Sequence, residues 1–181
     1  MIDSPRVPVV TVPGIDGSGP DHWQSLLEAA DPTIHRIAPA SWSEPVLDDW
    51  LAALDRAVAA CAAPPVLAAH SLGTLLVASW ASRGVAVAGA LLVALPHPAG
   101  PGFPAAAGTF RRPPRDPLPF PSVLVASSND PYDPHGAARE YASAWGSRFV
   151  DVGTAGHINA EAGFGPWPLG VTLLAELRSA A

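Results

Sequence analysis

The chain has 181 residues, enough to bury a core, and no internal repeat is visible, so we expect residues 1–181 to form a single domain. Acidic residues outnumber basic ones by 16 to 10, and the net charge of −6 argues against a nucleic-acid partner. All basic residues are arginines and Cys61 is the only cysteine, which excludes a lysine-dependent phosphate loop, a Schiff-base lysine, an intrachain disulfide and a thiolate metal cluster.

Apolar stretches typical of strands alternate with amphipathic stretches typical of helices. We expect strands at residues 7–12, 33–38, 64–70, 85–95, 122–127 and 148–152. We expect helices that start at Pro20, span 47–61, span 74–82, follow Pro134 and span 169–178. This alternation predicts an α/β fold, with about six strands in a mainly parallel sheet and helices on both faces. The proline-rich loop at 96–121 should border the mouth of a site as a minimal lid.

The stretch from Ala69 to Gly73 reads small-x-Ser-x-Gly and joins an apolar strand to an apolar helix. This is the nucleophile-elbow pattern, in which the strand and helix approach so closely that larger side chains would clash. Ala69 stands where glycine is usual, and alanine is small enough to fit. We therefore expect Ser71 to project from a strained turn above the edge of the sheet.

A serine hydroxyl needs a base, and six histidines are candidates. His70 directly precedes Ser71, but on a strand its side chain points to the opposite face. Four others are less suited by position. His22 and His35 lie on the first helix and an early strand, His97 lies just beyond a strand end, and His135 lies at the start of a helix. His157 lies in a glycine-rich loop after the last strand, and the order Ser…Asp…His is the one that α/β-hydrolases use. We therefore select His157 as the base.

Two carboxylates follow the strand at 122–127, and either could orient the base. Asp133 precedes Pro134, a sequence typical of a helix N-cap followed by proline at the first helical position. Asp130 has no such alternative role. We assign to Asp130 the task of fixing the tautomer and orientation of His157 and of stabilising the imidazolium.

An oxyanion hole needs two backbone N–H groups. We expect one from Leu72, directly after Ser71, and the other from Ile15, which follows Gly14 in the loop after the first strand.

No cofactor or metal is expected. Gly17 and Gly19 would need a third glycine at position 22 to form a dinucleotide fingerprint, and position 22 is His. The spacings typical of metal ligands are also missing.

These motifs resemble the small, nearly lidless α/β-hydrolases grouped with human retinoblastoma-binding protein nine and its bacterial relatives. The resemblance covers nearly the whole chain and rests on Pro13-Gly14, Asp21-His22-Trp23-Gln24, Trp42 with Asp49-Trp50, His70-Ser71-Leu72-Gly73, Ser127-Ser128-Asn129-Asp130-Pro131-Tyr132, and the blocks 156–161 and 163–168. It implies a triad of Ser71, Asp130 and His157. The Leu-x-Cys-x-Glu motif of the human relative is absent around Cys61, so its pocket-protein partner is not expected.

The chain should therefore be a serine hydrolase that cleaves carboxylic esters or amides of small substrates through an acyl-enzyme on Ser71. The alternative is a binding protein that keeps the hydrolase fold with little or no turnover. We expect a monomer or weak homo-oligomer without a membrane partner, because the longest apolar run, 85–95, is too short to cross a bilayer. The first residues lack a signal-peptide pattern, so a cytoplasmic location is expected.

Overall fold

The computed structural model describes residues 6–180, in which six strands form one sheet in the order β2-β1-β3-β4-β5-β6. The strands are β1 (Val9–Val12), β2 (Ile34–Arg36), β3 (Val66–His70), β4 (Gly89–Val93), β5 (Ser122–Ala126) and β6 (Arg148–Asp151). Every neighbouring pair is parallel. The expected six-stranded sheet is confirmed, and it is wholly parallel. The carboxyl ends of all strands therefore lie along the same edge.

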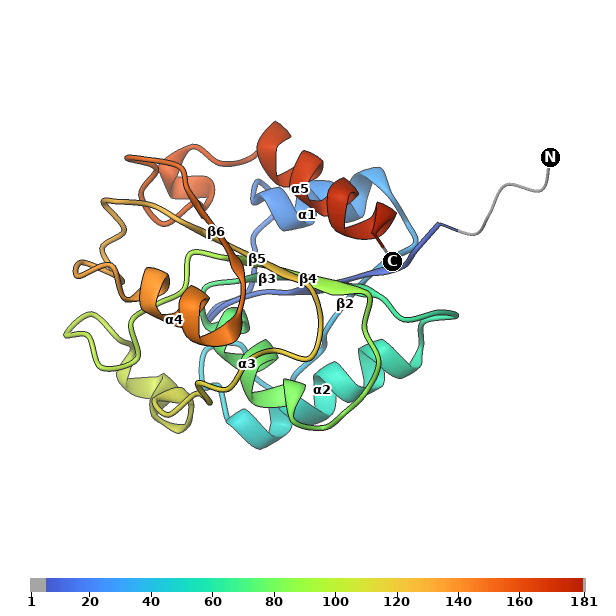
Figure 1. Ribbon diagram of the computed structural model, residues 1–181, viewed down its shortest axis with the longest axis horizontal. Coiled ribbons are helices and arrows are strands. Elements are labelled where there is room, and N and C mark those ends of the chain that lie inside the picture. Colours follow the sequence, from blue (N-terminus) through green and yellow to red (C-terminus); the bar gives the residue numbers. More distant parts are fainter. Residues whose placement is uncertain (1–5, 181) are drawn as a thin grey trace.

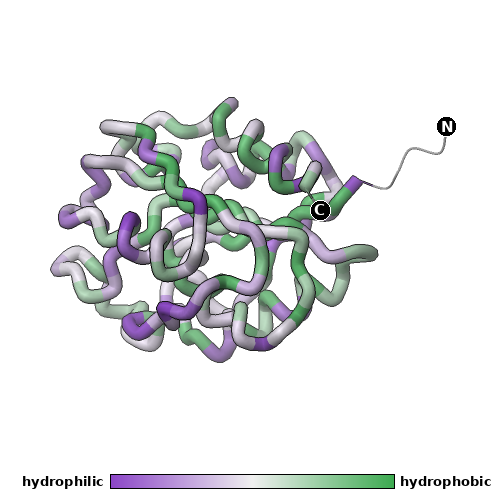
Figure 2. The backbone as a smooth tube through the Cα atoms, in the orientation of Figure 1, coloured by the Kyte–Doolittle hydropathy of each residue, from purple (hydrophilic) through white to green (hydrophobic). Residues whose placement is uncertain are grey.

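Helices cover both faces of the sheet (Figure 1). The α-helices are α1 (Trp23–Ala30), α2 (Leu47–Ala59), α3 (Leu72–Ala81), α4 (Ala137–Trp145) and α5 (Pro168–Ser179), and two short 3₁₀ helices are η1 (Ala105–Phe110) and η2 (Ala160–Ala162). Helices α2, α3 and α4 pack in one hydrophobic cluster, while α1 and α5 contribute to the cluster on the opposite face. Strands β3, β4 and β5 are buried along their whole length, which explains their continuous apolar sequence (Figure 2).

Several element boundaries differ from the expected ones, each for a local reason. Helix α1 begins at Trp23 rather than at Pro20, because His22 Nδ1 accepts the Gln24 N–H at 3.2 Å and so caps the helix. Helix α4 begins at Ala137 rather than after Pro134, because Gly136 has a φ of 71° that interrupts the helical backbone. Strand β4 ends at Val93 because Ala94, with a φ of 54°, turns the chain out of the sheet.

The long loop between β4 and β5 carries only the short η1 and no larger helix, which agrees with the expected minimal lid. Cys61 lies beyond the end of α2 and is half-buried, so it packs at the edge of the core rather than inside it. Between residues 6 and 180, no helix is long and apolar enough to cross a membrane.

Candidate active site

Ser71 occupies the turn between β3 and α3, at the carboxyl edge of the sheet. Its backbone has φ 53° and ψ −124°, a region that residues with a side chain rarely adopt. Such a conformation costs about 1–3 kcal/mol and persists only where its surroundings hold it. Here the Ser71 N–H donates to the Val93 carbonyl at 2.9 Å, and Thr74 donates to the Ser71 carbonyl from its N–H at 2.9 Å and its hydroxyl at 2.8 Å.

Small residues around Ser71 are required by close backbone approaches. A Cβ at Gly73 would lie 2.1 Å from the Val12 carbonyl oxygen, and a Cβ at Gly14 would lie 2.8 Å from the Ser71 Cβ. Ala69 is fully buried in β3. The elbow thus accommodates alanine at the position before the turn, whereas Gly73 has no room for a side chain.

The structure brings the side chains of Ser71, His157 and Asp130 into one hydrogen-bonded line. Ser71 Oγ lies 2.9 Å from His157 Nε2, and His157 Nδ1 lies 3.0 Å and 2.9 Å from the two carboxylate oxygens of Asp130. An ionised carboxylate can only accept, so Nδ1 carries the hydrogen, and Nε2 of the neutral ring is left to accept from the serine hydroxyl. Asp130 is 3% exposed and His157 is 8% exposed, so water competes little for these contacts.

The loop that carries His157 is anchored by side chains that follow β5, a feature the sequence analysis missed. The Ala155 N–H donates to Ser127 Oγ at 2.9 Å, and the Gly156 N–H donates to Asn129 Oδ1 at 2.8 Å. Ser127 also donates to Asn129 Oδ1 at 2.8 Å. Asp130 and His157 are therefore held together by the segments that carry them as well as by their side chains. The Ser-Ser-Asn-Asp sequence was the available signal, but it does not show which loop it would bind.

Asp133 is separate from this line of contacts. Its carboxylate accepts the N–H groups of Ala137 at 2.7 Å and Ala138 at 2.9 Å, at the start of α4. Burial raises the pKa of Asp133, and these hydrogen bonds oppose that effect. Asp133 thus binds the start of α4. The expected N-cap position was wrong, because Gly136 precedes the first helical residue, Ala137, and Pro134 lies outside the helix.

Ser71 opens into a cavity of about 250 Å³, which Leu72, Ile15 and His157 also line. Leu72 is the first residue of α3, a position whose N–H has no acceptor within the helix. The N–H of Ile15 forms no hydrogen bond with any part of the chain that the structure describes. Both N–H groups are therefore available to a ligand.

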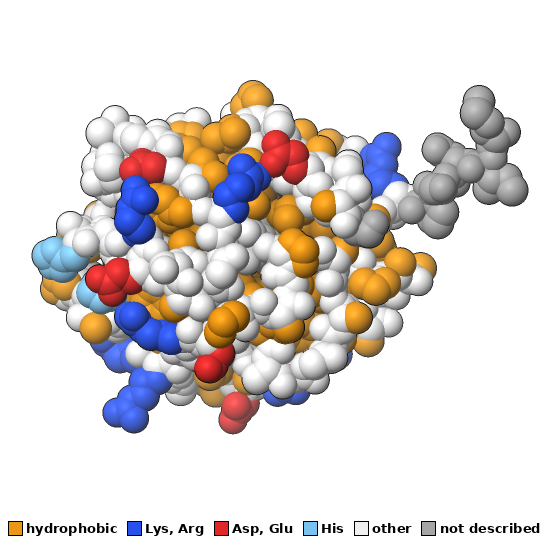
Figure 3. All heavy atoms as spheres, viewed as in Figure 1, with side chains coloured by type: hydrophobic (Ala, Val, Ile, Leu, Met, Phe, Trp, Pro, Cys, Tyr) orange, Lys and Arg blue, Asp and Glu red, His pale blue; other side chains and the backbone are white. Residues whose placement is uncertain are grey.

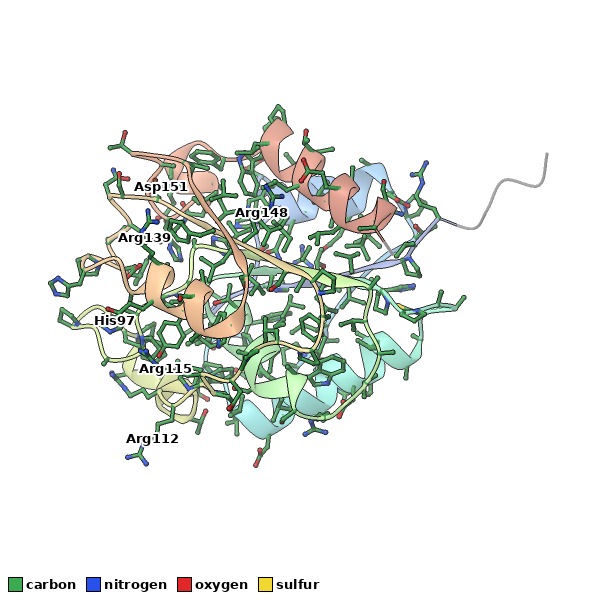
Figure 4. All side chains as sticks on the ribbon, viewed as in Figure 1. His97, Arg112, Arg115, Arg139, Arg148 and Asp151 are labelled. Carbon is green, nitrogen blue, oxygen red and sulfur yellow. The ribbon has the colours of Figure 1, made fainter. Side chains whose placement is uncertain are left out.

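Polar and apolar residues contribute about equally to the walls of the cavity, and two of the lining side chains are carboxylates. The Tyr132 ring lies with its centroid 4.5 Å from that of His157, and Asp16, Asn159 and Glu161 add polar groups. No arginine is among the lining residues that the structure describes. Several arginines instead lie at the outer surface shown in Figures 3 and 4, near α4, β6 and the segment after η1: Arg112, Arg115, Arg139 and Arg148. Within residues 6–180, no cluster of His, Cys, Asp and Glu is arranged to hold a metal ion.

Of the five other histidines, His35 lies exposed in β2 and the remaining four form two pairs. His97 and His135 face each other at the outer edge, with ring centroids 6.4 Å apart. His22 and His70 are buried beside His157, with centroid distances of 4.7 Å between them and 4.9 Å from His70 to His157. The sequence analysis set His70 aside because its side chain was expected to point away from Ser71. It did not predict that the His70 ring lies against the ring of His157.

The wholly parallel sheet, with Ser71 at the turn after the central strand β3, defines an α/β-hydrolase fold. A YdeN-like hydrolase from Pectobacterium atrosepticum is 38% identical, with a TM-score of 0.87 over 97% of this chain and 92% of that chain. The ydeN gene product of B. subtilis is 21% identical, with a TM-score of 0.81 over 96% and 99% of the two chains. A Paleococcus ferrophilus monoacylglycerol lipase, 13% identical with a TM-score of 0.73 over 97% of each chain, shares the fold.

The family model for serine hydrolases matches residues 9–176, and the chain therefore belongs to the serine hydrolase family. A search of curated proteins finds no match.

Proposed function

We propose that this serine hydrolase cleaves carboxylic esters of small substrates, and also amides, through an acyl-enzyme formed on Ser71. One observation carries the proposal: the continuous hydrogen bonding from Ser71 Oγ to His157 Nε2, and from His157 Nδ1 to Asp130. A serine hydroxyl is a weak nucleophile until a base accepts its proton, and this arrangement supplies a base that is itself oriented by a carboxylate. The resemblance to the retinoblastoma-binding protein nine group supports the same three residues.

In the first step, Ser71 Oγ attacks the carbonyl carbon of the ester while its proton passes to His157 Nε2. The bond from that carbon to the leaving oxygen then breaks, and His157 returns the proton to the departing alcohol. In the second step, His157 takes a proton from water, whose oxygen attacks the acyl carbon. Collapse of this intermediate breaks the bond to Ser71 Oγ, which regains its proton, and releases the acid.

The backbone of Leu72 and Ile15 is proposed to bind the oxyanion that develops in both steps. Both residues line the same cavity as Ser71, and within residues 6–180 neither N–H has a hydrogen-bond acceptor. Removing one such donor typically lowers kcat by about 10²–10³-fold. Asp130 keeps the hydrogen on Nδ1 of His157 and stabilises the imidazolium that forms.

The size of the cavity favours small acyl groups. Its volume of about 250 Å³ lies just below the range of about 300–1,000 Å³ that is typical of small-molecule sites. The loop between β4 and β5 supplies only Pro96 and Pro104 to the walls, so no large apolar lid is present in residues 6–180 to cover a long chain. We expect 4-nitrophenyl acetate and butyrate to be hydrolysed faster than esters of long-chain acids.

Labelling with a fluorophosphonate probe tests the proposal directly, since the probe reacts with serines that a base has activated. We expect rapid labelling of the wild type and none of Ser71→Ala. His157→Gln is a matched variant that keeps Ser71 but removes the base, and it should label far more slowly. A folded wild type that does not label would contradict the proposal and favour a binding protein on a hydrolase fold.

A further inference from the structure

His70 is buried, and the proposed triad does not use its side chain. It is the last residue of β3 and directly precedes Ser71, with 5% of its surface exposed. Its ring lies edge-on to that of His157, at 4.9 Å between centroids and an interplanar angle of 62°. A buried imidazole needs hydrogen-bond partners, and the partner of His70 lies in the loop of the proposed base.

His70 Nε2 lies 2.9 Å from the main-chain carbonyl oxygen of His157. A carbonyl oxygen only accepts, so Nε2 of His70 must carry the hydrogen. Burial, followed by the proximity of His157 and His22, holds the pKa of His70 well below 6.5. The ring is therefore neutral, with its one hydrogen on Nε2. A neutral ring does not repel the imidazolium that His157 becomes during the reaction.

The peptide group that accepts this bond is in an unusual backbone segment. His157 lies between Gly156, with a φ of 55°, and Ile158, with a φ of 47°. Positive φ is rare for a β-branched residue and costs about 1–3 kcal/mol, so the surrounding contacts must hold it. The peptide from His157 to Ile158 is fixed at both ends: its carbonyl accepts from His70, and its N–H donates to the Ala155 carbonyl at 3.2 Å.

The anchors of this loop lie on two sides of His157. Ser127 and Asn129 bind the N–H groups of Ala155 and Gly156, next to the acid Asp130. His70 binds the carbonyl of His157 from the segment that carries the nucleophile. Because His70 is covalently joined to Ser71, its bond ties the position of the base loop to that of the serine.

We propose that His70 is a positioning residue, whose Nε2–H bond to the His157 carbonyl sets the imidazole of His157 against Ser71. This rests on the proposed role of His157 as the base. Without the bond, the peptide after His157 loses the partner that fixes its carbonyl, and the backbone at Ile158 can relax. A displacement of about 1 Å at a reacting group can lower the rate about 10²-fold.

Two substitutions separate positioning from packing. His70→Phe keeps an aromatic ring of similar size but removes the donor, whereas His70→Gln keeps an N–H that can occupy the place of Nε2. We expect kcat for 4-nitrophenyl acetate to fall about 10–100-fold in His70→Phe, with KM within about threefold, and to recover to within about threefold of wild type in His70→Gln. Packing alone predicts the opposite order, since phenylalanine fills a buried site better than glutamine.

A second measurement does not depend on turnover. The Nδ1 proton of His157, bonded to Asp130, should give a low-field proton NMR signal in wild type and in His70→Gln, and this signal should shift or vanish in His70→Phe. If His70→Phe does not fold, His70→Asn replaces it, because the shorter amide cannot reach the carbonyl. A folded variant that lacks the bond to the His157 carbonyl, yet keeps both the signal and the wild-type kcat, would overturn the proposal.

The two measurements also distinguish this inference from the proposed function. If the wild type neither labels nor turns over esters, the proposed function fails, and the NMR signal alone decides whether His70 positions His157. If the wild type is active but His70→Phe and His70→Gln are equally impaired, the positioning role fails and the proposed function stands.

Discussion

Asp130 and Asp133 lie three residues apart in one loop, yet their carboxylates face different partners. Asp130 accepts from the imidazole of His157 and from the Tyr132 N–H at 2.9 Å. Asp133 accepts two N–H groups at the start of α4. Both are almost fully buried, so burial alone does not distinguish them. Their hydrogen-bond partners distinguish them. These partners predict that Asp130→Asn lowers kcat, whereas Asp133→Asn lowers stability.

We expect Asp130→Asn to lower kcat by about 10⁴-fold with little change in stability, because an amide no longer fixes the hydrogen on Nδ1 of His157. Asp133→Asn should lower the free energy of unfolding by about 1 kcal/mol and leave kcat within about threefold, since the amide caps α4 with only one oxygen. Ester hydrolysis and urea unfolding of both variants provide the check. Equal kinetic losses, or a larger loss in Asp133→Asn, would count against the assignment of Asp130.

The buried histidines also make stability depend on pH. Burial, Arg36 and His157 lower the pKa of His22 to about 4 from the usual 6.5. The folded state therefore binds fewer protons than the unfolded state between these two values. It follows that the free energy of unfolding falls as the pH decreases from about 6.5 towards 4, and that it is insensitive to this group at higher pH.

Replacing His22 by Asn should remove this contribution while keeping the cap on α1, because the amide oxygen can accept the Gln24 N–H in place of Nδ1. Between about pH 7 and pH 5, the wild type should lose about 2 kcal/mol more unfolding free energy than His22→Asn. Urea unfolding at the two pH values measures the difference. Equal losses would mean that folding does not lower the pKa of His22.

At the scale of elements, apolar periodicity was sufficient to predict all six strands and their alternation with helices. It did not predict where the elements end, because single backbone conformations set those points. Ala94 ends β4 and Gly136 delays α4, both through positive φ. Neither residue changes the hydrophobic pattern around it. The close approach of Gly73 to Val12 is the exception, since the elbow pattern itself requires a small residue there.

The candidate site was predictable in part. Chain order and strand ends selected Ser71, Asp130 and His157, which the structure brings within hydrogen-bonding distance; their catalytic roles are proposals. The supporting contacts were not predictable, because they join segments far apart in sequence. His70 and the carbonyl that it binds are 87 residues apart, and Asn129 and the N–H of Gly156 are 27 apart. A sequence pattern gives the polar residue but not its distant partner.

At the scale of the molecule, the described residues that line the cavity include two carboxylates and no arginine. The net charge is −6, and the ionisable carboxylates of Asp16 and Glu161 line the mouth beside Tyr132. Several arginines are engaged elsewhere: Arg139 lies 3.9 Å from Asp151, and Arg148 lies 2.6 Å from Glu176 (Figure 4). The field at the mouth should therefore repel anionic substrates.

This charge distribution predicts discrimination between two esters with acyl chains of similar length, 4-nitrophenyl butyrate and the anionic 4-nitrophenyl hemisuccinate. Each of the two carboxylates contributes about 1 kcal/mol of repulsion in a water-exposed setting. The two together, about 2 kcal/mol, should make kcat/KM for the hemisuccinate about 30-fold lower at low salt. The ratio of kcat/KM between the two esters should fall as salt is raised, because exposed charges are screened.

Glu161→Gln should lower this ratio as well. Glu176→Gln removes the same charge from α5, away from the cavity, and should leave the ratio nearly unchanged. If both variants lower the ratio of kcat/KM equally, the discrimination between the two esters comes from the net charge of the protein and not from the carboxylates that line the cavity.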